Sequence, residues 1–460
     1  MKCILDKNYR LRGWTDSLAN LEHFPTRALT KITPEEFVFL SACDGQKELD
    51  TNENAAFISR FSAMGAVSET NGEQLLPEQR YLFYNNRRFR KIDLSITGYC
   101  DFRCRHCFNA ADDKPRNVQH STEDILSLIE RLDECGVAGL RINGGEPLLN
   151  RDFLTITDEL RKRGMIFHEL ISNIYHLTPD IADSIKAQGH DPEIYVSFDG
   201  LGHHEWLRMK EGSEQRTLDN IKMLKEKGFF VHVHYCVWKD SLDAVRPTML
   251  KLRELGVDRV RITCIEPALR WVKSDNGQTV APSEWLEFVC GLLEWYNENI
   301  TNMALDVWCF WQQTGKRVKI IPDGHRTCDM EYRIPTCSDG YMMPFIDCDG
   351  RIMLCLGLSG ITKAYGIDWG NAYTDDIHAL LRDSDFVKQC GCTIGEMKDM
   401  NPECRDCEWR RHCQFGCRAE ALGQGNPVTG IDRRMCVFFK EGFYGRFLEI
   451  ADKYGLVYDK

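Results

Sequence analysis

The stretch Ile92–Cys107, IDLSITGYCDFRCRHC, runs from a strand candidate directly into three cysteines with C-x3-C-x2-C spacing. The next strand candidate, Val137–Asn143, runs in the same way into the sequence Gly-Gly-Glu-Pro. Between them lies a helix candidate, in which Ser121 and Asp124 have capping-box spacing and Gly136 follows as a stop. The pattern predicts a β-α-β unit whose two strands both end in chemically distinctive loops.

The same alternation continues to about residue 264. Further strand candidates lie at 166–172, 194–197, 229–237 and 259–263, and helix candidates at 218–227 and 242–255. Alternating strands and helices imply a parallel sheet with right-handed crossovers. Six such units predict an α/β fold of the partial (β/α)6 TIM-like barrel kind, with its chemistry at the C-terminal ends of the strands.

The two flanking regions differ from the barrel. The first holds a strand candidate (Tyr9–Trp14), two helix candidates (Pro34–Cys43 and Ala55–Met64) and a hairpin over Ala66–Leu76 that turns at Asn71-Gly72. That order predicts a winged-helix-like module. After residue 300 the periodicity weakens while cysteine and glycine increase, which is typical of a domain held together by metal. We therefore expect three domains, 1–85, 86–300 and 301–460.

Composition narrows the class of protein. The 460 residues are 43% hydrophobic and 28% charged, which is typical of a globular protein. No apolar run reaches the length of a membrane span and the N-terminus lacks a secretory signal, so we expect a cytoplasmic protein without a membrane partner. The net charge of −11 argues against a nucleic-acid partner. The basic cluster at 87–91 is interpreted as a solvated linker.

Cysteine usage is the most informative part of the composition. The chain has 21 cysteines, and a reducing cytosol favours metal binding or catalysis over disulfides. Six are scattered singly and are interpreted as small buried hydrophobes: Cys3, Cys43, Cys135, Cys236, Cys264 and Cys290. Most of the others fall into two groups.

The first group is the triplet Cys100, Cys104 and Cys107. Three thiolates on one loop can hold three irons of a cubane cluster and leave the fourth iron open to a substrate, whereas an electron-transfer cluster needs four cysteines. A zinc half-site or a redox pair is the alternative. Zinc would need a fourth ligand, and the side chain of His106 is expected to point away from the cysteines.

Together with Gly-Gly-Glu-Pro after the second strand, this triplet resembles the radical S-adenosylmethionine (SAM) superfamily over residues 91 to about 264. Glycines let the backbone approach a ligand closely, and a glutamate can accept hydrogen bonds from an ammonium group. The resemblance implies a [4Fe–4S] cluster on the three cysteines and one-electron cleavage of SAM. It also implies a set of contacts with SAM: Gly144, Gly145, Glu146, Pro147, Ser172, Asn173, Ser197, Asp199 and Arg208.

The second group lies in the last third of the chain. Its core has the spacing C-x2-C-x5-C-x3-C from Cys404 to Cys417, followed by Cys436, and further upstream Cys337 and Cys355 bracket a hairpin-like segment. A zinc ribbon would need only four of these ligands.

The pattern resembles the SPASM domain, which carries two auxiliary four-iron clusters. The resemblance assigns Cys404, Cys407, Cys413 and Cys436 to one cluster, and Cys337, Cys355 and Cys417 to the other. For the fourth ligand of the second cluster, Cys309 is the first choice, Cys328 the second and an open site the third. Cys348, Cys390 and Cys392 are left over.

Barrels with this extension mostly modify peptides or proteins. The N-terminal module resembles the leader-binding domain of peptide maturases, and could offer a strand edge to an extended leader; a structural cap is its alternative. The resemblance implies a maturase with three [4Fe–4S] clusters and SAM, which installs a thioether or carbon–carbon crosslink in a precursor peptide. It would also need a reductant such as flavodoxin or ferredoxin. The alternatives are a protein maturase that oxidises a side chain, and an iron–sulfur electron-transfer or sensor protein that only binds SAM.

Overall fold

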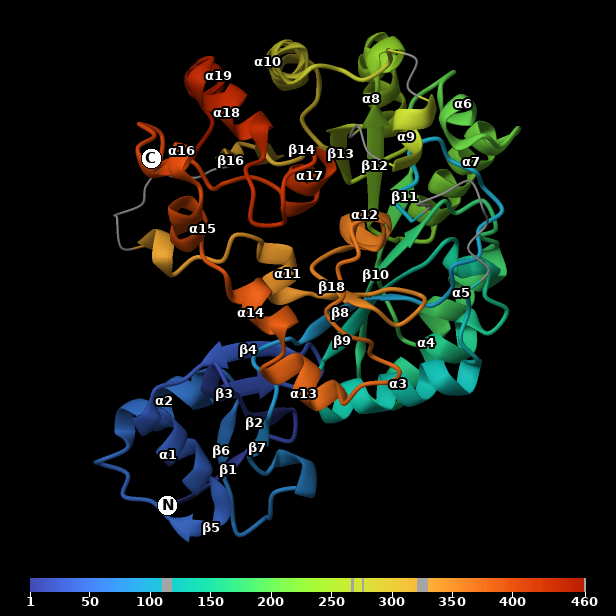
Figure 1. Ribbon diagram of the computed structural model, residues 1–460. Helices are drawn as coiled ribbons and strands as arrows, with labels where there is room; N and C mark the ends of the chain where they lie inside the picture. The colour runs from blue at the N-terminus through green and yellow to red at the C-terminus, as the bar shows by residue number, and fades with distance from the viewer. Residues whose placement is uncertain (110–117, 266–268, 275–276, 321–329, 459–460) are drawn as a thin grey trace.

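The computed structural model describes residues 1–109, 118–265, 269–274, 277–320 and 330–458. An N-terminal module lies at one end of the molecule, and a large sheet with helices on its outer side forms the middle (Figure 1). The C-terminal elements lie across the other side of that sheet (Figure 1). No helix within these ranges is both long enough and apolar enough to span a membrane.

The large sheet has the strand order β16-β15-β14-β13-β12-β11-β10-β9-β8-β17-β18 within the described residues. The run from β8 to β14 is parallel throughout. Its strands are β8 (Lys91–Ser95), β9 (Gly139–Asn143), β10 (Ile166–Ser172), β11 (Glu193–Ser197), β12 (Val231–Val237), β13 (Arg259–Cys264) and β14 (Ala304–Val307). The six predicted strands and the partial barrel are confirmed, and β14 extends the parallel run beyond them.

Amphipathic helices cover the outer side of these strands (Figure 1). They are α3 (Thr122–Glu134), α4 (Phe153–Lys162), α5 (Pro179–Ala187), α7 (Ser213–Glu226) and α8 (Val245–Glu254). The predicted cap of α3 is confirmed, because the Ser121 side chain accepts from the backbone N–H of Asp124 at 3.1 Å. Shorter pieces complete this region: η2 (Pro147–Leu149), α6 (His204–Arg208), η3 (Lys239–Ala244) and α9 (Leu269–Ser274). The long α10 (Pro282–Asn299) follows them.

The two faces of the parallel strands differ in chemistry. Apolar residues such as Ile92 and Leu94 point to the helices, and the residues between them point to the inner face. There Arg141 bonds Asp93 and lies 3.4 Å from Glu169, measured from Nη1 to Oε2. The inner face is therefore lined by ion-paired side chains rather than by an apolar core.

The N-terminal module corrects one prediction. Residues 1–85 form two small sheets, and the segment 66–76 is no hairpin: β6 pairs antiparallel with β1 instead. The strand β1 offers buried apolar side chains, whereas Glu73 and Gln74, beyond the expected turn, are exposed and polar. The first sheet has the order β5-β1-β6, with β1 (Lys2–Leu5), β5 (Asp44–Glu48) and β6 (Val67–Glu69). The helices α1 (Pro34–Ala42) and α2 (Ala55–Ala63) match their predicted positions.

The second sheet of the module faces the barrel. It has the order β4-β3-β2-β7, with β2 (Tyr9–Trp14), β3 (Ser17–His23), β4 (Ala28–Lys31) and β7 (Leu82–Tyr84), the last after η1 (Pro77–Gln79). Gly136 admits this contact, because a Cβ there would meet the Tyr84 ring at 2.4 Å. The Arg27 side chain donates to the carbonyl of Gly164 at 2.9 Å, and Arg90 pairs with Glu22 at 2.6 Å.

The C-terminal part continues the large sheet at both of its edges. The strands β15 (Trp311–Thr314) and β16 (Arg317–Ile320) follow β14 as an antiparallel extension. The predicted hairpin before Cys355 is confirmed as β17 (Phe345–Ile346) and β18 (Ile352–Met353), and β17 pairs with β8. Short helices fill the rest: η4 (Met330–Tyr332), α11 (Ser338–Met342), η5 (Leu356–Leu358), α12 (Ser359–Ala364), α13 (Ile377–Arg382), α14 (Asp385–Gly391), α15 (Ile394–Met400), α16 (Pro402–Arg405), α17 (Arg418–Gly423), α18 (Arg433–Lys440) and α19 (Phe443–Lys453).

Candidate active site and cysteine clusters

The three cysteines after β8 converge at the C-terminal end of the barrel. Burial raises the pKa of Cys104 to about 11, and the neighbouring Cys107 acts in the same direction. Burial raises the pKa of Cys100 as well, with Cys104 and Cys107 among the further causes. Thiols that raise one another's pKa values are close together. A metal cation bound to all three sulfurs would offset the repulsion between their thiolate charges. This donor set fits a cluster with three protein ligands.

Hydrogen bonds from neighbouring elements hold the cysteine loop in place. The backbone N–H of Arg105 donates to the carbonyl of Leu207 at 2.9 Å, and the Arg105 side chain donates to the carbonyl of Trp206 at 3.0 Å. From α9, the Arg270 side chain donates to the carbonyl of Cys104 at 3.3 Å. The loop is therefore fixed by α6 and α9, which follow later strands of the barrel.

Gly144 and Gly145 let the second loop pack on the first. A Cβ at Gly144 would lie 2.6 Å from the carbonyl oxygen of Thr97, and one at Gly145 would lie 2.4 Å from that of Tyr99. The Gly145 N–H donates to the Thr97 carbonyl at 2.7 Å. Any side chain at these positions would push the loops apart. In the described residues, the close approach is to the chain's own backbone beside the cysteines.

Glu146 joins the ends of β9 and β10. Its buried carboxylate accepts from the Ser172 hydroxyl at 2.7 Å, the Asn173 N–H at 2.8 Å and the Leu148 N–H at 3.1 Å. Burial raises the pKa of Glu146, while the hydrogen bonds from Asn173 and Ser172 oppose that shift. Pro147 begins η2 directly behind it. The predicted acceptor is thus already engaged by three donors from the protein.

Asp199 and Arg208 form a buried pair beside Cys104. The Arg208 guanidinium binds both carboxylate oxygens of Asp199, and its Nη1 lies 3.8 Å from the Cys104 sulfur. Although burial favours the neutral acid, Arg208 holds the pKa of Asp199 far below its ordinary value. The structure therefore brings two of the predicted SAM contacts together as partners of each other. Ser197 lies nearby as the last residue of β11.

His106 and Cys236 join this group, and the sequence analysis assigned neither of them to it. A ring nitrogen of His106, a carboxylate oxygen of Asp199 and the Cys236 sulfur lie within 4.8 Å of one another. Burial, followed by the charge of Arg208, lowers the pKa of His106 to about 3. The available signal was position, because Cys236 stands at the C-terminal end of β12. Since Asp199 is bound to Arg208, we assign no metal to this trio.

The four cysteines predicted for the outer auxiliary cluster line one cavity. Cys404, Cys407, Cys413 and Cys436 surround it together with Lys398 and aromatic side chains. Burial raises the pKa of Cys404 to about 11, and Cys436 and Cys407 contribute to the shift. Burial raises the pKa of Cys413 to about 12. Four thiols that line one pocket fit a fully ligated cluster.

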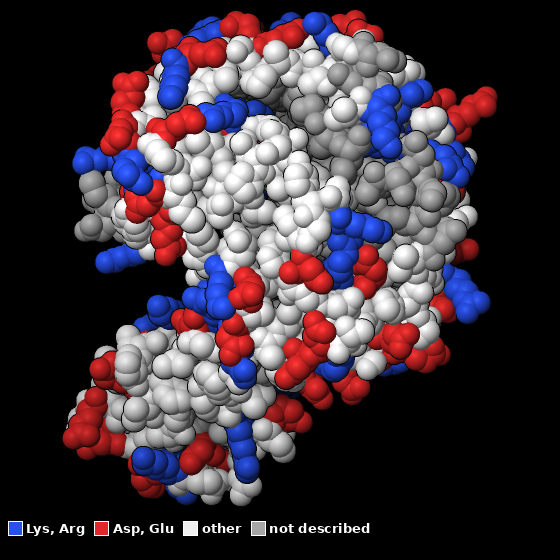
Figure 2. Space-filling view, viewed as in Figure 1, with Lys and Arg blue, Asp and Glu red and all other residues white. Residues whose placement is uncertain are grey.

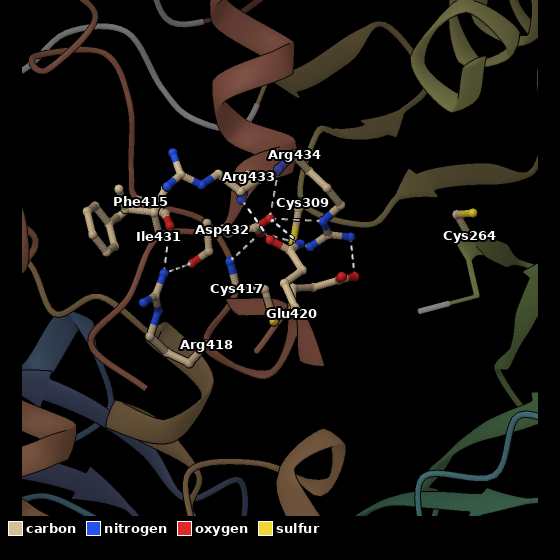
Figure 3. Close-up of polar contacts among 12 residues, drawn as sticks. Cys264, Cys309, Phe415, Cys417, Arg418, Glu420, Ile431, Asp432, Arg433 and Arg434 are labelled. Atoms are coloured by element: carbon tan, nitrogen blue, oxygen red, sulfur yellow. Dashed lines mark hydrogen bonds and ion pairs between the residues drawn. The ribbon is translucent and has the colours of Figure 1, made fainter. Parts of the chain in front are cut away.

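The inner auxiliary site is built from more distant segments. The side chain of Cys417, followed by burial, raises the pKa of Cys309 well above its ordinary value, so these two thiols are neighbours (Figure 3). Gly357 brings Cys355 toward α17: a Cβ at Gly357 would lie 3.7 Å from the Cys355 sulfur and 3.3 Å from the Cβ of Ala419. The Cys337 sulfur accepts from the N–H of Gly340 at 3.4 Å.

The remaining cysteines near these sites have different surroundings. Cys348 and Cys390 are buried, and burial followed by Cys337 raises the pKa of Cys390. Cys392 packs in the same small apolar group as Cys404 and Cys436. Cys328, the second choice for the inner site, lies outside the described residues.

Acidic and basic side chains are interspersed over the visible face of the molecule. Figure 2 shows them along its edge and across its lower middle, with a largely uncharged region in the upper middle. A notch separates the N-terminal module from the C-terminal part on the left of the view (Figure 2).

Comparison with known proteins gives consistent results. A family model for the Radical SAM superfamily matches residues 94–252. The crystal structure of Streptococcus suis SuiB bound to precursor peptide SuiA covers 94% of this chain and 99% of that chain, with a TM-score of 0.66 and 14% identity. Native anSMEcpe with bound AdoMet and Cp18Cys peptide covers 79% and 98%, with a TM-score of 0.60 and 16% identity. The AdoMet-dependent heme synthase of Methanosarcina barkeri is 24% identical over 342 residues, which are 72% of this chain and 92% of the relative.

These likenesses concern both the overall fold and the segment that carries the cysteine triplet. At such low identities the two solved structures establish the fold, and the family model covers the barrel strands that carry the cysteine loop and the Gly-Gly-Glu-Pro loop. The converging thiols of Cys100, Cys104 and Cys107 lie within this matched segment. The chain therefore contains a Radical SAM domain, which spans residues 94–252.

Proposed function

We propose that this enzyme matures a ribosomally synthesised precursor peptide by installing a thioether or carbon–carbon crosslink. The observation that carries the proposal is the extent of the likeness to SuiB, which spans 94% of this chain. A match of that length takes in most of the N-terminal module as well as the barrel and the C-terminal cysteines. Because SuiB is seen with its precursor peptide, a peptide substrate is the class that this arrangement favours.

We assign the radical-generating site to Cys100, Cys104 and Cys107, which would hold a [4Fe–4S] cluster with SAM beside it. When bound, these groups supply a 5′-deoxyadenosyl radical that can remove a hydrogen atom from an unactivated carbon. Around them, Gly144 and Gly145 keep the two loops in contact.

Other residues orient this site. Glu146 fixes the Ser172–Asn173 strand end, and Asp199 orients Arg208 toward Cys104. Ser172 and Asn173 are assigned as contacts with the ribose part of SAM, and Ser197 as a further contact with SAM.

Two further [4Fe–4S] clusters complete the proposed cofactor set of three. The outer one would be held by Cys404, Cys407, Cys413 and Cys436, which line one cavity. The inner one would be held by Cys309, Cys337, Cys355 and Cys417, and the contact between Cys309 and Cys417 supports Cys309 as its fourth ligand. An oxidative crosslink needs an acceptor for a second electron, which is the chemistry that auxiliary clusters supply.

The leader of the precursor peptide is proposed to add a strand at the β6 edge of the N-terminal module. The other edge of that sheet, β5, is already covered, because the Gln46 side chain donates to the carbonyls of Gly72 and Glu73. The backbone N–H groups of Gln46 and Lys47 are bound by the Asp44 carboxylate at 2.8 and 2.9 Å. These contacts leave β6 as the edge for strand addition. We place the enzyme in the cytoplasm, with flavodoxin or ferredoxin as its reductant.

A side-chain oxidation of the sulfatase-maturase type is the second candidate, favoured by the likeness to anSMEcpe with its bound Cp18Cys peptide. That likeness covers 79% of the chain against 94% for SuiB. The two candidates predict different products. A crosslinked peptide loses two hydrogens and keeps all of its sulfur, whereas oxidation of cysteine to an aldehyde releases the sulfur.

The test is an anaerobic incubation of the loaded enzyme with SAM, a reductant and the peptide encoded by the nearest short cysteine-rich reading frame. We expect 5′-deoxyadenosine together with a peptide that has lost two hydrogens, both measured by mass spectrometry. Production of 5′-deoxyadenosine with an unchanged peptide, or with a peptide that has lost sulfur, would refute the crosslinking proposal. Since a relative is a heme synthase, a porphyrin precursor is the small-molecule control.

A further inference from the structure

Arg418 is a buried cation that forms no ion pair with a carboxylate among the described residues. It is 1% exposed, and it begins α17 directly after Cys417. Its guanidinium donates to four backbone carbonyls: Val428 at 2.9 Å, Gly430 at 2.6 Å, Phe415 at 2.6 Å and Gly416 at 3.4 Å. Its Nε has no hydrogen-bond partner among the described residues. Carbonyl oxygens accept hydrogen bonds from Nη1 and Nη2 but leave the net charge buried, and such a charge is costly without a counter-charge.

The neighbouring Arg434 differs from Arg418 because carboxylates neutralise its charge. It is paired with Asp432 at 2.9 Å and also with Glu420, and its Nη2 lies 4.0 Å from the Cys309 sulfur. Figure 3 shows Arg434 between these two carboxylates, with Arg418 on the other side of the group. Asp432 is fully occupied by Arg434, by the N–H of Cys417 at 3.0 Å and by Gln424 at 3.3 Å. It therefore acts on Arg418 only through space.

Arg418 is bound to the segment that links the two sets of proposed ligands. It directly follows Cys417, which is assigned to the inner cluster, and its guanidinium donates to the carbonyls of Phe415 and Gly416. These two residues stand between Cys417 and Cys413, which is assigned to the outer cluster. Arg418 thus lies against the short segment that connects a ligand of each cluster.

We propose that Arg418 is the counter-charge shared by the two auxiliary clusters, so that it sets the reduction potentials of both. This inference rests on the two-cluster part of the proposed function. A four-iron cluster held by thiolates carries net negative charge, which grows on reduction, so a buried cation between two such clusters stabilises the reduced state of each. Arg418 acts on electron transfer by setting the reduction potentials of the clusters, and it does not contact the substrate.

The first test is a redox titration of the full-length, reconstituted protein followed by electron paramagnetic resonance. Arg418→Met removes the charge at similar length, and Arg418→Lys keeps the charge. We expect both auxiliary midpoint potentials to become more negative in Arg418→Met at unchanged iron content, and to stay near wild type in Arg418→Lys. The matched control is Arg433→Met, which removes a half-exposed arginine paired with Glu403 and leaves the inner potential unchanged. Unshifted potentials in a fully loaded Arg418→Met protein would overturn the proposal.

The second test separates charge from hydrogen bonding by thermal unfolding with and without clusters. If Arg418 serves the clusters, Arg418→Met lowers the midpoint of the loaded protein but not that of the metal-free protein, where the guanidinium is an unbalanced charge. If metal-free Arg418→Met melts well below metal-free wild type, or if Arg418→Lys fails to load, the backbone hydrogen bonds are the role of Arg418 and the proposal fails. Wild type with only about four irons per chain would instead refute the auxiliary clusters themselves.

Discussion

At the scale of single residues, Glu146 shows how a motif residue can act through its neighbours. From its place in the Gly-Gly-Glu-Pro sequence, its carboxylate is expected to accept hydrogen bonds from the ammonium group of SAM. In the structure the same carboxylate accepts from Ser172, Asn173 and Leu148, and thereby connects the ends of two adjacent strands. A buried acceptor with several donors is costly to disturb. Glu146 therefore holds the ends of β9 and β10 together, and its contact with SAM stays a prediction.

Glu146→Gln separates the two roles. In this variant an NH2 group replaces one carboxylate oxygen and faces the protein N–H and O–H donors that this oxygen accepted from. We therefore expect the free energy of unfolding to fall by about 1–3 kcal/mol. We expect SAM affinity to fall only in proportion to this loosening. Denaturant unfolding and calorimetric SAM binding measure the two effects, and Ser172→Ala should act in the same direction more weakly. Weaker SAM binding at unchanged stability would show that Glu146 contacts SAM directly.

The cysteine triplet has a sharper test. Changing Cys100, Cys104 and Cys107 together to Ala should abolish 5′-deoxyadenosine formation and remove about a third of an expected twelve irons or so per chain. Iron analysis and product chromatography measure both effects. Cys290→Ala, which removes a buried thiol of α10, is the matched control and should change neither. If the triple variant still cleaves SAM, the radical site lies elsewhere.

At the scale of elements, β6 is an outer strand of the first sheet of the N-terminal module and presents an edge for strand addition. In the antiparallel ladder, Ala66 and Thr70 bond to β1 through Asp6 and Lys2. Because backbone groups alternate between the two sides of a strand, the intervening Glu69 directs its N–H away from β1. This is the position at which an added leader strand would need a donor.

Glu69→Pro removes that outward donor and leaves the β1 ladder intact. We expect the affinity for a synthetic leader peptide to fall at least several-fold in fluorescence anisotropy, while SAM cleavage without peptide stays unchanged. Glu69→Ala is the control, since it keeps the N–H and should bind the leader like wild type. Equal leader binding by Glu69→Pro and wild type would exclude strand addition at β6.

At the scale of the whole molecule, the N-terminal module is joined to the barrel at the end opposite the cysteine loop. Gly136 and Gly164 follow helices α3 and α4 and precede the next strands. Gly136 lies against Tyr84 of β7, and Gly164 lies against the turn between β3 and β4. The pairing of Glu22 with Arg90 connects the same surfaces, and Glu22 is almost fully buried. The module is therefore a structural base for the barrel as well as the proposed peptide-binding part.

Truncation to residues 86–460 should separate these contributions. We expect SAM cleavage per folded molecule to continue at a similar rate, because the cysteine loop lies at the other end of the strands. Peptide modification should fall sharply, and the thermal midpoint should drop because Arg90 loses its partner. Glu22→Gln in the intact chain should reproduce part of that drop, by about 1–3 kcal/mol, with peptide modification preserved. A truncated enzyme that modifies peptide at the full rate would reduce the module to a cap.

The sequence by itself determined the features that depend on neighbours along the chain. Hydrophobic periodicity located all six predicted strands and the cap of α3, and short spacings located Cys100, Cys104 and Cys107 as well as the C-terminal cysteines. Such features follow from a few adjacent residues. They suffice for the fold of the barrel and for the grouping of the thiols within each loop.

Only the tertiary structure decided the pairings between distant segments. It pairs β6 with β1 instead of with its own downstream residues, binds Arg208 to Asp199, and engages Glu146 with protein donors. It also sets Cys309 beside Cys417, 108 positions later in the chain. The physical reason is that a polar or apolar group takes the best partner that packing brings within reach, and local spacing does not specify that partner.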